Sequence, residues 1–148
     1  MSEHRVNVVW ERAGKPFDEK YVRDHEWRFP GGTVVGASSA PELSGNPKLV
    51  DPEAAFTASI SSCHMMWFLY LTAKAGYVVD DYSDNAVGYL ERKSRGVMWV
   101  PRVELTPVAT FAGTTPSLDE LRRLHDESHE RCFIANSVMT EIIVNLPS

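Results

Sequence analysis

The residues best able to do chemistry in this chain are its two cysteines, Cys63 and Cys132. A thiolate is both a nucleophile and a metal ligand, so each could serve in redox chemistry, in hydrolysis beside a histidine base, or in a metal site. A free cysteine is also among the most buried residue types and often acts only as a small hydrophobic side chain. The two thiols by themselves therefore leave catalysis, metal binding and plain core packing open.

Histidines lie near both cysteines. His125, His129 and Cys132 recur at i, i+4 and i+7 on one helical stripe, and His64 directly follows Cys63. Zinc accepts such donors, but paired-ligand knuckles are absent and a histidine pair at this spacing is common. For a hydrolase, nothing fixes which histidine would be the base. The metal alternative stays open on this spacing, and no cofactor is predicted.

Cys63 lies in a long uncharged run, because residues 54–73 contain no Asp, Glu, Lys or Arg. A membrane span needs about 20 predominantly apolar residues, whereas this run contains several Ser and Thr and has no basic flank to orient it. A buried helix is the better interpretation. Asp51 as N-cap, Pro52 and Glu53 predict its start, and Gly76 after Lys74 predicts its end. A helix that is uncharged on nearly every side is expected to be buried on nearly every side, with a partner subunit supplying the missing cover.

The rest of the chain alternates between strand and helix patterns. Strands are predicted at 5–11, 21–29 and 33–39, a loop at 40–52, strands of a meander or hairpin at 77–92 and 97–113, a second helix from the capping box at 117–120 to about Cys132, and a closing strand at 137–146. This order favours an α+β fold with half-buried antiparallel strands over a doubly wound α/β fold. We expect a single domain over residues 1–148.

Composition narrows the function classes. The net charge is −5 in 148 residues, whereas a nucleic-acid surface needs a clustered basic face. No early stretch has the pattern of a secretion signal, and two cysteines do not make a disulfide scaffold. We therefore expect a cytoplasmic protein that binds neither nucleic acid nor a membrane.

Two segments resemble motifs of the OsmC/Ohr family of thiol-dependent peroxidases. "VDPEAAFTASISSCHMMWFL" is similar to the family's central helix, which starts with Asn/Asp-Pro-Glu and carries its first cysteine ten residues after the glutamate, as Glu53 and Cys63 do here. "SHERCFIANSV" resembles the second cysteine motif, in which Ser or Asn follows the cysteine shortly before a final strand. The resemblance implies an intertwined homodimer in which antiparallel sheets wrap two long central helices.

The resemblance also implies a reaction. Cys63 would attack an organic hydroperoxide and become a sulfenic acid, Cys132 would resolve it as a disulfide, and an external dithiol would reduce that bond. In the family, an arginine from an early strand or loop lowers the pKa of the first cysteine, and the helix-start glutamate, here Glu53, holds that arginine. The family's glycine-rich loop is missing here, so the arginine is assigned by strand alternation. Arg23 shares a face with Trp27 and Phe29, Arg28 points the other way, and His25 is a further candidate.

Two departures from the family pattern point to a divergent substrate. Phe133 follows Cys132 where the family often has proline, and His64 stands where peroxidase members have an apolar or aromatic residue. Phe56, Met66, Trp67 and Phe133 would favour a bulky organic hydroperoxide, although they could equally be core residues. The alternative function is a non-catalytic protein of the same fold that binds a small hydrophobic ligand or a metal.

The helix geometry predicts a site shared between two subunits. At about 1.5 Å per residue, Glu53 and Cys63 lie about 15 Å apart along one straight helix, and ten residues turn their side chains onto different faces. One arginine is not expected to bridge them within a chain, unless a kink at the Ser61-Ser62 pair shortens the gap. Two such helices packed antiparallel would bring Glu53 of one subunit towards Cys63 of the other.

Overall fold

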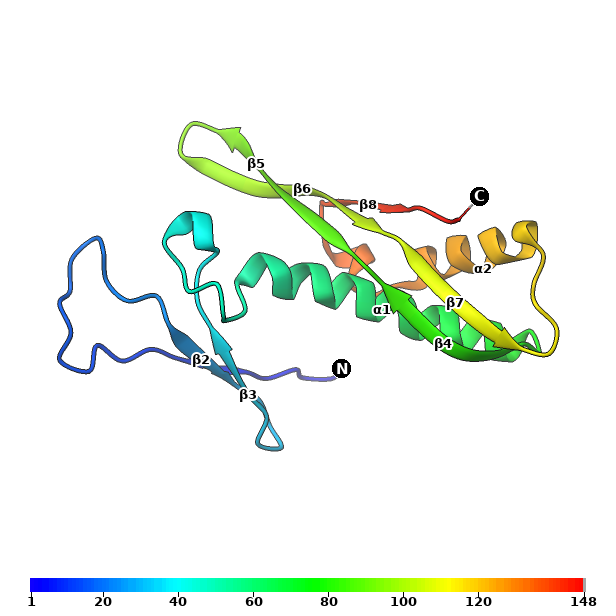
Figure 1. The fold of residues 1–148 in the computed structure, drawn as a ribbon, viewed down its shortest axis with the longest axis horizontal. Coiled ribbons are helices and arrows are strands. Elements are labelled where there is room, and N and C mark those ends of the chain that lie inside the picture. The colour runs from blue at the N-terminus through cyan, green and yellow to red at the C-terminus, as the bar shows by residue number, and fades with distance from the viewer. Residues whose placement is uncertain (148) are drawn as a thin grey trace. The chain divides into compact units, whose positions relative to one another are not determined.

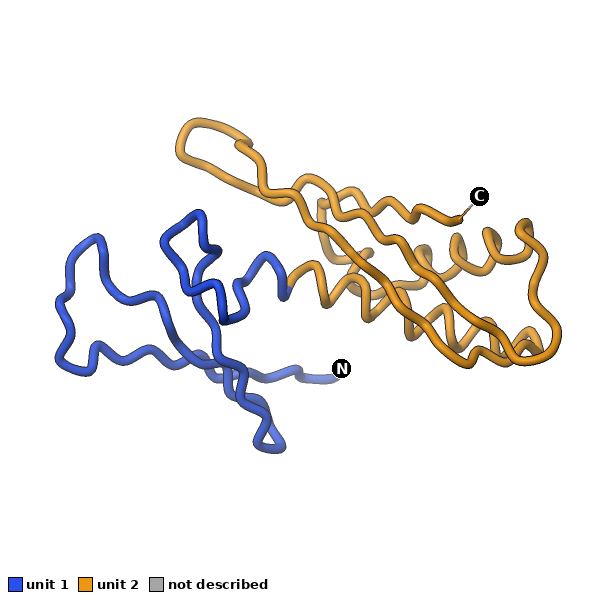
Figure 2. The backbone as a smooth tube through the Cα atoms, in the orientation of Figure 1, with its two compact units in different colours: residues 1–55 blue, residues 56–148 orange. Residues whose placement is uncertain are grey.

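The structure is a computed structural model that describes residues 1–147. The chain divides into two compact units, residues 1–55 and 56–148, which Figure 2 shows in blue and orange. The boundary falls at the start of helix α1 (Pro52–Lys74). The expectation of one domain over the whole chain stays a prediction.

The N-terminal unit holds a small antiparallel sheet of order β1-β2-β3. Its strands are β1 (Asn7–Val9), β2 (His25–Arg28) and β3 (Val34–Ala37), and a 3₁₀ turn, η1, follows at Pro41–Leu43. The predicted strands at 5–11 and 21–29 are therefore too long. The residues before β2 turn back on themselves instead, because Tyr21 N–H donates to Asp18 O and the Arg23 guanidinium donates to Glu19 O and Tyr21 O.

Helix α1 begins and ends where its sequence predicts. Asp51 Oδ1 accepts a hydrogen bond from Ala54 N at 2.9 Å, which satisfies a first-turn amide. At the other end Gly76 has φ +88°, a left-handed conformation that glycine adopts without steric cost. Tyr77 N donates to Thr72 O and Gly76 N to Ala73 O, the paired bonds of a Schellman cap.

One face of α1 is buried within the chain and the opposite face is not. The buried residues are Thr57, Ile60, Cys63, His64, Phe68, Leu71 and Thr72. The exposed residues on the other side, at the same helical spacing, are Ser59, Ser62, Met66, Tyr70 and Ala73. The chain's own strands and second helix therefore cover only one stripe, and the expectation that a partner subunit covers the rest stays a prediction.

The predicted hairpin forms, and it is bent in the middle. Strands β4 (Val78–Asp84) and β5 (Val87–Ser94) return as β6 (Val97–Leu105) and β7 (Pro107–Ala112), with β5 pairing β6 and β4 pairing β7, all antiparallel. Figure 1 shows this long ribbon. The Asp84 carboxylate fixes the bend, since it accepts from Thr106 N at 2.7 Å and from the Ser61 hydroxyl of α1 at 2.5 Å.

The last strand, β8 (Glu141–Val144), lies beside β6 and runs parallel to it. The expectation of purely antiparallel sheets is therefore wrong at this edge. The physical reason is that α2 (Leu118–Arg131) and the 3₁₀ turn η2 (Ala135–Ser137) intervene between β7 and β8, and this connection is long enough to return the chain for a parallel pairing. The α+β class is confirmed, with the closing strand shorter than the predicted 137–146.

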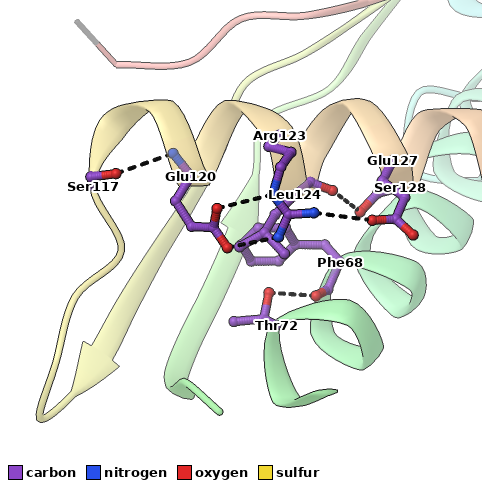
Figure 3. A network of polar contacts seen from close by, with 8 residues as sticks. All are labelled: Phe68, Thr72, Ser117, Glu120, Arg123, Leu124, Glu127 and Ser128. Carbon is purple, nitrogen blue, oxygen red and sulfur yellow. Dashed lines mark hydrogen bonds and ion pairs between the residues drawn. The ribbon is translucent and has the colours of Figure 1, made fainter. Parts of the chain in front are cut away.

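Helix α2 is capped and braced by polar contacts along its exposed side, as Figure 3 shows. The Ser117 hydroxyl accepts from Glu120 N at 3.2 Å, which confirms the predicted capping box in part. Arg123 then pairs with Glu120 at 2.7 Å and Glu127 at 3.5 Å. The opposite side buries Leu124, His125 and Ser128, so an amphipathic helix lies on α1.

Two apolar clusters hold the C-terminal unit together. The first joins Ile60 of α1 to Val103 and Leu105 of β6, and the second joins Phe68 and Leu71 of α1 to Leu124 of α2. Gly88 of β5 permits close approach, because a Cβ there would clash with Thr57 Oγ1. Within residues 1–147, no helix is long and apolar enough to cross a membrane.

Candidate active site

The two cysteines come together in the C-terminal unit. Cys63 lies in the middle of α1 and is 7% exposed, and Cys132 is the residue that caps the end of α2 and is 1% exposed. Both are free thiols, and they lie close enough for Cys63 to influence the pKa of Cys132. Residues 69 positions apart in sequence are thus paired by the packing of one helix on the other.

The surroundings of Cys132 keep it protonated. Burial raises the pKa of its thiol to about 11, and the hydrogen bond with Cys63 is the next cause of that rise. Ala135 N–H donates to Cys132 Sγ at 3.4 Å and acts in the opposite direction. At neutral pH Cys132 is therefore a thiol in contact with Cys63.

Cys63 opens onto a pocket of about 350 Å³, lined by Cys63, Met66, Trp67, Tyr70, Arg131 and Phe133. Trp67 is its central wall, with Tyr70 and Phe133 edge-on to it at 5.8 and 5.7 Å between ring centroids. Met66, Trp67 and Phe133 thus lie where the sequence analysis placed them, beside the first thiol. Phe56 does not, because it packs on the cluster of Ile60, Val103 and Leu105.

Tyr70 and Arg131 are pocket residues that the sequence analysis missed. Tyr70 lies seven residues, or two helical turns, after Cys63, so both lie at the edge where the buried and exposed faces of α1 meet, and helical spacing alone could have indicated it. Arg131 directly precedes Cys132, and that adjacency to the second thiol is the sequence signal that could have indicated it.

His64 faces α2 and takes no part in the pocket lining. Its Nε2 lies 2.9 Å from His125 Nδ1, and the two imidazole rings stack with their centroids 5.2 Å apart. Phe68 stacks on the His125 ring, with 4.2 Å between the ring centroids. Burial lowers the pKa of His64 to about 4, with a further lowering from the charge of His129 and an opposing effect of Asp84. Burial, followed by the charge of His64, lowers the pKa of His125 to about 3. The pair is neutral at pH 7.

The metal alternative receives no support from this arrangement. His125 is engaged with His64 rather than with His129 and Cys132. Among residues 1–147, no three His, Cys, Asp or Glu side chains are grouped in a way that could hold a metal ion. The stripe at i, i+4 and i+7 is explained by a histidine pair in the core and a capping cysteine.

Glu53 and Arg23 lie in the N-terminal unit. Burial is the main cause that raises the pKa of Glu53, and Asp51 adds to it through a hydrogen bond and its charge. Arg23 stacks 4.1 Å over the Tyr21 ring. It lines a pocket of about 530 Å³ whose other residues are Trp10, Phe17, Tyr21, His25, Ser38, Ser39 and Pro52.

The pleat argument for Arg23 is wrong, because Arg23 precedes β2 instead of lying within it. Arg28 does lie in the strand, where it is exposed and pairs with Glu26 at 2.9 Å. Arg23 remains the better candidate for another reason: it shares its pocket with Pro52, the residue before Glu53. The roles of Arg23 and Glu53 beside a thiol stay predictions.

Fold and site together define a class: an α+β protein with a buried helical thiol in contact with a second thiol and opening onto an aromatic pocket. The sequence model for "OsmC-like protein" matches residues 45–146. The chain belongs to the OsmC-like protein family. The resemblance seen in the two cysteine motifs is thereby confirmed.

Solved structures agree with this assignment. An OsmC-like protein of unknown function from Vibrio cholerae O1 biovar eltor str. N16961 shares 44% identity, covers 99% of this chain and 100% of its own, and superposes with a TM-score of 0.94. An organic hydroperoxide resistance protein OsmC from Legionella pneumophila (17% identity, 99% and 96% covered, TM-score 0.74) and the organic hydroperoxide resistance protein OhrB of Bacillus subtilis (14%, 99% and 98%, TM-score 0.72) share the fold. No curated protein matches the chain.

The histidine pair predicts a pH dependence of stability. Its folded pKa values, about 4 and about 3, lie below the ordinary 6.5, so the unfolded chain binds more protons below pH 6.5. The free energy of unfolding is therefore highest above that pH and falls as the pH drops towards 4. Between about pH 6 and 5 the pair accounts for a loss of roughly 2 kcal/mol, measurable by urea unfolding.

His125→Gln keeps an amide partner for His64 and removes one titrating ring, so the loss should be about half as large. His4→Gln, at an exposed histidine of the N-terminal unit, should leave it unchanged. A dependence as steep in His125→Gln as in the wild type would show that other groups, such as His129 or carboxylates, are responsible.

Proposed function

We propose that this protein is a thiol-dependent peroxidase that reduces organic hydroperoxides. One observation carries the proposal: Cys63 lines an apolar pocket and also touches a second free thiol, Cys132. The first contact gives an organic peroxide access to a nucleophile, and the second gives the oxidised sulfur a resolving partner. The names of the Legionella pneumophila and Bacillus subtilis proteins of this fold, both organic hydroperoxide resistance proteins, agree with this activity.

The chemistry balances with the groups present and one external reductant. The Cys63 thiolate attacks the terminal oxygen of the hydroperoxide, the O–O bond breaks, and the alkoxide takes a proton from solvent and leaves as the alcohol. Cys63 is then a sulfenic acid. Cys132 sulfur attacks Cys63 Sγ, the S–S bond forms, and the hydroxide that leaves combines with the Cys132 proton as water. An external dithiol is oxidised to its disulfide as it returns both cysteines to thiols.

The interaction between the two thiols also affects when Cys132 becomes able to attack the Cys63 sulfenic acid. While Cys63 is reduced, its hydrogen bond and charge help to raise the pKa of Cys132. Oxidation of Cys63 to the sulfenic acid removes the charge contribution, so Cys132 ionises more readily at the stage when it must attack. Burial, the larger cause, remains throughout.

A homodimer completes the proposed site. Ser59, Ser62, Met66, Tyr70 and Ala73 form an uncharged, exposed stripe on α1, and Met66 and Tyr70 are 59% and 57% exposed. A second copy of the helix would cover that stripe. Arg23, oriented by Glu53, would then stand beside Cys63 of the partner subunit and stabilise its thiolate. The reducing cytoplasm is the compartment in which such thiols persist.

Steady-state turnover tests the activity. With cumene hydroperoxide and a dithiol reductant, the wild type should consume peroxide catalytically and Cys63→Ser should lose at least about a hundredfold in kcat/KM, because the attacking atom is gone. Cys132→Ser should consume about one equivalent of peroxide per subunit and then stop, when the dithiol used reduces disulfides faster than sulfenic acids. The reason is that the Cys63 sulfenic acid can no longer become a disulfide. Ser94→Ala, at an exposed residue of β5, serves as the matched control.

If wild type and Cys63→Ser consume peroxide equally, the peroxidase proposal fails. The remaining function would then be that of a non-catalytic protein that binds a small hydrophobic ligand in the aromatic pocket.

Mixed dimers test whether the site is shared. Cys63→Ser and Glu53→Ala subunits, each inactive or weak alone, should regain up to half of the wild-type activity per heterodimer, because one site then has Cys63 from one subunit and Glu53 from the other. The reciprocal heterodimer, wild type with Cys63→Ser/Glu53→Ala, should be weak. The opposite pattern in heterodimers verified by native mass spectrometry would place Glu53 and Cys63 of one chain in the same site.

A further inference from the structure

The pocket at Cys63 contains a cation that the peroxidase reaction itself does not require there. Among the six residues that line it, Arg131 alone carries a charge, and the walls are otherwise aromatic, thioether or thiol. Polar and apolar groups are unequally distributed in the pocket. Trp67, Tyr70 and Phe133 form an apolar aromatic wall, and the Arg131 guanidinium is the one charged group beside it. A pocket of this kind binds an amphipathic molecule better than a purely apolar one.

Arg131 is held in place at this pocket. It is the last residue of α2, its Nη2 pairs with Glu127 Oε1 at 2.9 Å, and its guanidinium lies 5.6 Å from the Trp67 ring centroid. The ion pair uses one nitrogen of a planar fork that carries five N–H donors. Its side chain is 49% exposed in the single chain, and it belongs to α2 and not to the α1 stripe that a second copy would cover.

We propose that Arg131 is a specificity-determining residue that selects organic hydroperoxides bearing a carboxylate. The proposal rests on the peroxidase function above. The hydroperoxide group lies at Cys63, the apolar body lies against Trp67, Tyr70 and Phe133, and the carboxylate pairs with the Arg131 guanidinium, whose fork matches its geometry. Because Arg131 touches the remote end of the substrate, it acts on binding and not on the O–O bond.

The test compares two substrates with the same body: cumene hydroperoxide carrying a para carboxylate, and the methyl ester of that acid. The measured quantity is the ratio of kcat/KM for the acid to kcat/KM for the ester. Arg131→Gln should lower this ratio about tenfold, the worth of one partly exposed charge-assisted contact. Arg131→Lys should give a ratio between those of the wild type and Arg131→Gln, since it keeps the positive charge and loses the planar guanidinium.

The matched control is Arg122→Gln, the same change on the same helix at an arginine that does not line this pocket. It should leave the ratio at the wild-type value. If Arg131→Gln slows both substrates equally, so that the ratio is unchanged, the proposal is overturned and Arg131 acts on the thiol instead.

A binding measurement separates this inference from the proposed function. The alcohols that correspond to the acid and the ester are titrated into Cys63→Ser protein, with and without Arg131→Gln, by calorimetry. A tenfold loss of preference for the acid in Arg131→Gln supports the role of Arg131 even if the wild type turns over neither hydroperoxide. Equal affinities for acid and ester in both backgrounds would overturn it even if turnover is fast.

Discussion

The packing of α2 on α1 is the constraint on which the site depends. Phe68 and Leu71 of α1 meet Leu124 of α2 in one cluster, and His64 and His125 stack beside it. About two further helical turns along α2 bring the chain to Cys132, and the same packing sets it near Cys63. The two histidines stabilise this packing because both are neutral and are hydrogen-bonded to each other. The interface between α1 and α2 therefore has no buried charge at this pair.

The end of α2 then fixes where the second sulfur points. Cys132 has an extended conformation that stops the helix, and its N–H still donates to His129 O at 3.3 Å. The Asn136 side-chain amide donates to Glu130 O and Cys132 O, both at 2.9 Å, while Ala135 N–H donates to the sulfur itself. These contacts give a physical reason for an Asn shortly after the second cysteine: it satisfies carbonyls that the helix leaves without partners.

Local signals predicted the helices well. Asp51, Gly76 and Ser117 act through contacts within a few residues, so their capping roles could be inferred from sequence alone. The strand predicted at 97–113 as half-buried likewise agrees with β6, in which the alternate residues Val103 and Leu105 are buried. The parallel pairing of β8 with β6 and the late start of β2, at His25, depend on contacts between distant or irregular segments, and no periodicity encodes them.

The site was predictable to the same extent. Cys63 and Cys132 followed from two motifs, whereas Arg131 and the partnership of His64 with His125 depend on how α2 is rotated against α1. Helical spacing shows that His125 belongs to the buried face of α2, but not which residue of α1 it meets. The positions of His64, buried between α1 and α2, and of Arg131, in the pocket lining, depend on the packing of the two helices and could not be predicted from sequence alone.

The most direct measurement of the central claim is the state of the two sulfurs after a single encounter with peroxide. Reduced protein is treated with one equivalent of cumene hydroperoxide, quenched with an alkylating agent and mapped without reduction. The account predicts one peptide pair linked through Cys63 and Cys132, lighter by two hydrogen atoms, with neither cysteine alkylated. Cys63 recovered as sulfinic or sulfonic acid beside an alkylated, unlinked Cys132 would contradict it.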